Sequence, residues 1–143
     1  MTALSTTPTT SSDSLLRLAM RADAVLSGLC GIALMAAAGP LSGFTGFPKA
    51  AEYGVGAGFV VYGIVVFLAA GPQRVRSAGI ATMIANLVFT VATVLVVLAV
   101  DLTTAGVVVT LASGVYTLVF ADLQYLGVRR INKRCPSAVP SEV

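Results

Sequence analysis

Carboxyl, amide and phenol groups lie within long apolar stretches of this sequence, where they are the side chains best placed to carry out chemistry. They are Asp23, Tyr62, Asn86 and Asp122. An ionisable group inside hydrocarbon costs at least a few kcal/mol unless it is paired or hydrated, so each is a candidate functional residue. The two aspartates could carry protons or attract a cation, and the tyrosine and asparagine could hydrogen-bond to them.

These residues come from four different apolar stretches, and all four lie in the same half of the bilayer when counted at about 1.5 Å per helical residue. If all point inward, they form one intramembrane cluster, with Arg21 able to pair with Asp122 or with Asp23. One interpretation is structural: an ion pair and bonds from Asn86 hold the helices together. Another is a proton or cation relay, or a polar headgroup site open to the cytoplasm, with both aspartates as acids. A third has one aspartate reaching the membrane interface.

The third apolar stretch supports an inward polar face. Its polar residues follow the spacing of one side of a helix. They are Thr82, Asn86, Thr90 and Thr93.

The elements that must position these groups are transmembrane helices. The 143 residues are 57% hydrophobic and 10% charged, with a mean hydropathy of +0.93, outside the range of soluble domains. A helix needs about 20 apolar residues to cross a bilayer. The apolar stretches run over about 15–38, 53–70, 78–100 and 104–127. We predict an all-α membrane protein, a four-transmembrane-helix antiparallel bundle in residues 14–128.

The spacing of repeated residues is compatible with two tandem hairpins. Tyr62 and Tyr116 are 54 residues apart, and Arg21 and Arg76 are 55 apart. Duplication of one hairpin would give this spacing, and so would two hairpins of similar length.

The positive charges predict the orientation. Eight of the nine Lys and Arg residues lie near the ends of the stretches or between them on one side, and only Lys49 lies on the other. Short loops rich in Lys and Arg stay in the cytoplasm, so we expect both termini there. Residues 1–13 are predicted to be a disordered cytoplasmic tail and residues 129–143 a basic one.

The basic tail is expected to contact anionic lipid headgroups. The residues concerned are Arg129, Arg130, Lys133 and Arg134. No aromatic residue is interleaved with them, and we expect no nucleic-acid partner.

Small residues predict where helices approach one another. Gly54 and Gly58 form a G-x-x-x-G pair on the second stretch, and Gly106 and Gly114 mark one side of the fourth. They are expected to pack helices within the bundle, or alternatively to form a homo-oligomer interface. Residues 40–52 are predicted to be a loop, either a plain connector or one whose phenylalanines enter the membrane interface.

Several chemistries lack their residues. The chain has no histidine, which excludes histidine metal sites and Ser-His or Cys-His catalytic pairs within one chain. Cys30 lies midway along the first stretch and Cys135 in the tail, so no disulfide is expected. We predict no cofactor, no metal and no enzyme activity.

Five segments carry a family resemblance. They are residues 16–25, 36–41, 54–62, 102–106 and 122–130. The chain resembles small four-span integral membrane proteins of actinobacteria, with a fainter similarity to DoxX-like four-span proteins in size and hairpin layout. The resemblance implies a four-span architecture and a bacterial plasma membrane, and it implies no activity.

The expected function is therefore non-enzymatic: an accessory, assembly or scaffold subunit that binds a membrane-protein partner or a second copy of itself. The alternative is a small oligomeric transporter, coupled to protons or cations through Asp23 and Asp122.

Overall fold

The structure, a computed structural model, describes residues 11–71 and 75–134. These residues form helices and contain no strand. The helices are α1 (Ser11–Ala36), α2 (Ala38–Thr45), α3 (Lys49–Ala69), α4 (Val75–Ala99) and α5 (Thr104–Arg134). The long helices α1, α3, α4 and α5 are each long and apolar enough to cross a membrane. The predicted all-α four-span bundle is confirmed, and the protein is a multi-pass membrane protein.

The surface of the bundle is apolar and its interior holds polar groups. Leu98 is 79% exposed and Leu68 is 68% exposed, whereas Asn86 is 3% exposed and Gln124 is fully buried. This is the reverse of a soluble domain, in which buried polar groups are the exception. The arrangement suits a hydrocarbon solvent, which accepts leucine readily but cannot hydrogen-bond an amide.

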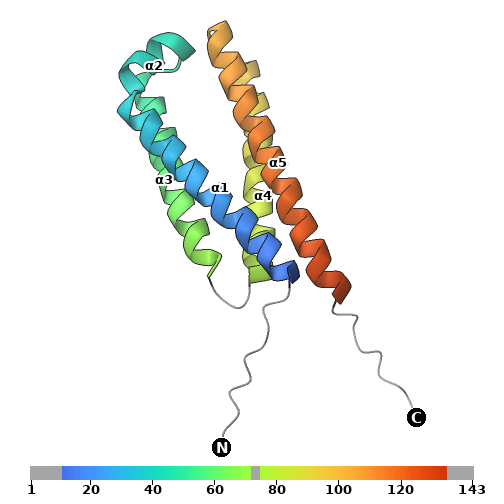
Figure 1. Ribbon diagram of the computed structural model, residues 1–143. Helices are drawn as coiled ribbons and strands as arrows, with labels where there is room; N and C mark the ends of the chain where they lie inside the picture. Colours follow the sequence, from blue (N-terminus) through green and yellow to red (C-terminus); the bar gives the residue numbers. More distant parts are fainter. Residues whose placement is uncertain (1–10, 72–74, 135–143) are drawn as a thin grey trace, which may run out of the picture.

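The long helices pair as two antiparallel hairpins (Figure 1): α1 packs along α3, and α4 along α5. The hairpins meet mainly through α1 and α5, while α3 and α4 touch little. They lie closest where α1 begins and α5 ends, and they diverge toward α2. We call the first end the basic end, because its exposed cations are Arg21, Arg76, Arg129, Arg130 and Lys133.

Glycines allow the close contact within the first hairpin. A Cβ atom on Gly56 would lie 2.8 Å from the carbonyl oxygen of Gly31, and one on Gly63 would lie 2.6 Å from that of Ala24. Both distances are too short for real atoms, so α1 and α3 can approach this closely only because these side chains are absent. Neither glycine was predicted from the sequence to pack helices.

The glycines that were predicted from the sequence to pack helices divide into two groups. Gly106 packs against the backbone of Thr45, and Gly114 packs against the side chain of Thr93. Gly54 and Gly58 are exposed, and no neighbouring atom lies within 4 Å of where their Cβ atoms would be. Their predicted role in packing within the bundle is therefore wrong, because Gly56 lies between them on the side that faces α1.

Threonines join the helices of the second hairpin. The hydroxyl groups of Thr90 and Thr117 lie 2.8 Å apart, and Thr90 also donates to the carbonyl oxygen of Gly114 (3.2 Å). Thr82, Asn86 and Thr93 are buried. The inward polar face predicted for this segment is the face that packs on α5.

An apolar cluster closes the basic end. Its buried members are Leu16, Met20, Ala24, Val66, Ala70, Val75 and Val128. Beside it, the guanidinium of Arg17 donates to the carbonyl oxygens of Ala70 (2.7 Å) and Gly71 (3.0 Å), where α3 ends. A basic side chain satisfies the free carbonyls of a helix terminus in this way and complements its partial negative charge.

The expected loop over residues 40–52 is largely helical. Pro40 has no N–H to continue α1, so α1 ends at Ala36, and Pro40 lies in the first turn of α2, where a missing N–H is tolerated. The short α2 docks on the start of α5: Thr103 donates its N–H to the carbonyl oxygen of Thr45 (3.1 Å) and its hydroxyl to that of Phe44 (2.5 Å). The two hairpins are thus joined at this end as well.

Two further boundaries differ from prediction. The helix α3 begins at Lys49 rather than near residue 53, and α5 continues to Arg134, so the basic residues 129–134 are helical instead of part of a tail. Residues 1–10 and 135–143 lie outside the described residues, as does Arg74.

Candidate functional site

Asp23 is the centre of the polar interior. Its side chain is fully buried in α1, just above the apolar cluster that closes the basic end. Side chains from every long helix hydrogen-bond to its carboxyl group. They are Ser27 of α1, Tyr62 of α3, Asn86 of α4, and Tyr116 and Gln124 of α5. We call Asp23 and these residues the Asp23 cluster.

The two oxygens of Asp23 differ in their surroundings. Oδ2 accepts from the Tyr62 hydroxyl at 2.7 Å, the Asn86 amide at 2.9 Å and the Gln124 amide at 3.1 Å. Oδ1 has only the hydroxyls of Ser27 at 3.3 Å and Tyr116 at 3.5 Å. Hydrogen bonds between oxygens are usually about 2.7–2.8 Å long, so the Oδ1 contacts are weak and the Oδ2 contacts are strong.

The partners of Asp23 hold one another in place. The Asn86 amide also donates to the side-chain oxygen of Gln124 (3.3 Å), and the Tyr62 hydroxyl lies 3.2 Å from the side-chain oxygen of Asn86. A phenol has one hydrogen, and its shorter contact is to Asp23, so Tyr62 donates there. The network leaves the orientation of both amides fixed.

The structure places three of the expected cluster residues together and two outside. Asp23, Tyr62 and Asn86 meet, as the sequence predicts. Asp122 and Arg21 are exposed, and no ion pair between them occurs in the described part of the chain. The expected inward position of Asp122 is wrong because it lies about 100° around the helix from Ala121, which is buried.

Gln124 and Tyr116, rather than Asp122, are the residues of α5 that contact Asp23. Neither was predicted from the sequence. A signal for Gln124 was present. Gly114, Thr117, Ala121 and Gln124 follow spacings of 3, 4 and 3, which keep them on one side of a helix. All four are buried. Asp122 is out of phase with this series.

A cavity of about 560 Å³ lies between the two hairpins, on the side of the Asp23 cluster away from the basic end. Drug-sized ligands occupy pockets of about 300–1,000 Å³, so the cavity can hold a small organic molecule. Most of its wall is apolar. The apolar lining residues are Leu26, Cys30, Val55, Gly58, Phe59, Ala85 and Phe89.

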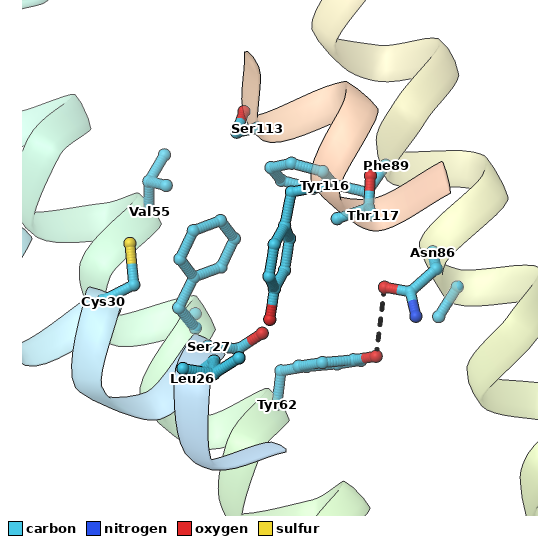
Figure 2. Close-up of a pocket in the computed structure, with 13 residues that line it drawn as sticks. Leu26, Ser27, Cys30, Val55, Tyr62, Asn86, Phe89, Ser113, Tyr116 and Thr117 are labelled. Atoms are coloured by element: carbon cyan, nitrogen blue, oxygen red, sulfur yellow. Dashed lines mark hydrogen bonds between the residues drawn. The ribbon is translucent and has the colours of Figure 1, made fainter. Parts of the chain in front are cut away.

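The polar part of the wall belongs largely to the Asp23 cluster. Ser27, Tyr62, Asn86 and Tyr116 all line the cavity, while Asp23 lies behind them. Figure 2 shows the Tyr116 side chain reaching from α5 toward Ser27 of α1, with its hydroxyl end near Tyr62. The cavity therefore borders partners of both carboxyl oxygens, since Ser27 and Tyr116 bond to Oδ1 while Tyr62 and Asn86 bond to Oδ2.

Aromatic rings border the cavity between α3 and α4. The rings of Phe59 and Phe89 contact each other with centroids 5.2 Å apart, tilted by 56°. This is one of the few contacts between the two helices, so the cavity is bounded on this side by a pair of side chains rather than by packed backbone.

The chemistry available here is hydrogen bonding, proton binding and attraction of a cation. In residues 11–71 and 75–134, no group of three or more His, Cys, Asp or Glu side chains lies together. Comparisons of the chain with protein-family models, curated proteins and solved structures found no match.

Proposed function

We propose that this protein is a non-enzymatic membrane protein that binds a small amphipathic molecule between its two hairpins, as a small transporter or carrier. The observation that carries the proposal is the cavity of about 560 Å³ that is apolar along its walls and polar at one end. Such a cavity would take a molecule with an apolar body and one polar group directed at the Asp23 cluster.

The membrane and the orientation are part of the proposal. The exposed cations gather at the basic end, and Lys49 lies at the other. This distribution supports a cytoplasmic basic end in a bacterial plasma membrane, with Arg129, Arg130, Lys133 and Arg134 at anionic headgroups. The membership in a four-span actinobacterial family that the sequence suggests would agree with that location.

Two glycines of α3 give a matched test of the cavity. Gly58 lines it and Gly54, one turn away, does not, although both are exposed. We expect Gly58→Leu to weaken binding of the neutral probe 1-aminoanthracene by about tenfold or more, equal to about 1.4 kcal/mol, because the new side chain occupies ligand volume. Probe fluorescence would be titrated with the protein in lipid nanodiscs, after subtraction of empty nanodiscs.

In the same titration, Gly54→Leu should bind the probe as the wild type does. Equal affinity of all three proteins would contradict the proposed binding site, and so would an absence of saturable binding to the wild type.

The second candidate function is the accessory or scaffold subunit expected from the sequence. The exposure of Gly54 favours it, since a Cβ atom there would meet no neighbouring atom, and a partner helix or a second copy could approach closely. For this role, Gly54→Leu should abolish co-purification of a larger partner in mild detergent. For ligand binding, Gly58→Leu is the variant that matters.

A further inference from the structure

Within residues 11–71 and 75–134, no cationic side chain hydrogen-bonds to the Asp23 carboxyl group. It is fully buried, and its hydrogen-bond partners are hydroxyls and amides. A buried carboxylate in apolar surroundings is retained only if it is neutralised by a proton or by an opposite charge. Arg21, two residues earlier in α1, is exposed. Since no described side chain supplies the balancing charge, a proton or a bound cation would supply it.

The geometry places such a charge at Oδ1. Oδ2 already accepts from three donors at 2.7–3.1 Å, which leaves no room for a hydrogen of its own. Oδ1 has only two long contacts, and both partners are hydroxyls, which can rotate from donating to accepting. A proton on Oδ1 would be accepted by Ser27 or Tyr116 without disturbing any bond to Oδ2.

The cavity wall also suits a cation. Four aromatic rings line it: Phe59, Tyr62, Phe89 and Tyr116. The face of an aromatic ring attracts an organic cation by about 0.5–2 kcal/mol, most strongly where water is excluded. The rings and the carboxylate thus favour the same charge, and most of the remaining wall is apolar.

We propose that the cavity binds an organic monocation with an apolar body, and that this cation exchanges with a single proton on Oδ1 of Asp23. The inference rests on the proposed function, because it names the class of molecule that the cavity holds. When the cation binds to protein with neutral Asp23, the O–H bond at Oδ1 breaks and one proton passes to solvent, so the net charge in the site stays constant.

Asp23 is the group whose protonation changes in this exchange. The other titratable groups that face it are the phenols of Tyr62 and Tyr116, with the Cys30 thiol farther along the cavity wall. These groups are neutral when protonated and do not charge near pH 7 as free groups. Ser27, Asn86 and Gln124 do not titrate, and Arg17 is bound at the end of α3.

Binding of tetraphenylphosphonium at a series of pH values tests the exchange. We expect its affinity for the wild type in nanodiscs to fall by up to about tenfold per pH unit on acidification, since one proton competes with one cation. Proton release in weakly buffered solution should accompany binding in the same pH range. The neutral probe 1-aminoanthracene should bind independently of pH over that range.

The variants separate this inference from the proposed function. In Asp23→Asn, the affinity for the cation should fall at least tenfold and should no longer depend on pH. Tyr116→Phe leaves every Oδ2 partner in place, so this variant should bind the cation with an altered affinity that still depends on pH. If the neutral probe binds but cation affinity is independent of pH and no proton is released, the inference is wrong and the proposed function stands. If neither probe binds the wild type, the proposed function fails too. The proton-release measurement needs no variant, so poor folding of Asp23→Asn would not prevent the test.

Discussion

Replacing Asp23 by alanine is expected to lower the free energy of unfolding by about 3–5 kcal/mol. The change removes the acceptor of bonds from Tyr62, Asn86, Tyr116 and Gln124, all on other helices. Hydrogen bonds between helices in bilayers contribute about 0.6 kcal/mol each on average. The donors left without an acceptor inside the bundle add a further penalty of about 1–3 kcal/mol. Unfolding in mixed micelles at rising dodecyl sulfate fractions would measure the change.

Asp122→Ala is the matched control for this prediction. Its carboxyl group is exposed, and its loss should change the free energy of unfolding by no more than about 0.5 kcal/mol. If Asp122→Ala destabilised the protein as much as Asp23→Ala does, the assignment of Asp23 rather than Asp122 as the buried carboxylate would be contradicted.

Gly63→Leu is expected to destabilise the first hairpin strongly. A Cβ atom there would lie 2.6 Å from the Ala24 carbonyl oxygen and 3.1 Å from the Gly28 backbone. Overpacking usually costs about 1–3 kcal/mol when side chains can adjust. Here the obstacle is backbone, so α1 and α3 must separate, and we expect a loss of more than about 3 kcal/mol. Size-exclusion profiles after heating the detergent-solubilised protein would report it.

The control again is Gly54→Leu on the same helix, where a new side chain has open space. It should keep the thermal stability of the wild type. A Gly63→Leu protein as stable as this control would show that α1 and α3 do not approach each other as closely as described.

Length and composition were enough to predict the fold. Each long helix contains an uninterrupted apolar stretch that has no alternative to spanning a bilayer, and short connections make consecutive spans antiparallel. The spacing of the polar residues was enough to predict that Asn86 faces inward, because several threonines share its side of the helix. The same spacing argument places Asp122 on the exposed side of α5, because Gly114, Thr117, Ala121 and Gln124 share the buried side.

The glycine contacts could not be assigned from sequence alone. Gly54, Gly56 and Gly58 alternate along α3, so they divide between opposite sides of the helix. Which side meets α1 depends on the partner helix. The G-x-x-x-G spacing selected the pair on the exposed side, whereas Gly56 and Gly63, seven residues apart, face α1.

Two further features, the short helix α2 and the cavity, depend on tertiary contacts. The short α2 contains Gly39, Pro40 and Gly43, which are typical of loops, and it is supported by its bonds to Thr103, the residue before α5. The cavity depends on how far the two hairpins diverge, and hydrophobic periodicity carries no information about that distance. Both features follow from parts of the chain that are distant in sequence.

The central claim is that side chains of all four long helices hydrogen-bond to the carboxyl group of Asp23. A double-mutant cycle between Asp23 and Gln124 tests it most directly. Alanine at both positions should show an interaction energy of at least about 0.5 kcal/mol, because the Gln124 amide donates to Asp23 at 3.1 Å. The parallel cycle between Asp23 and Asp122 should show none beyond about 0.3 kcal/mol. Coupling to Asp122 with none to Gln124 would contradict the account.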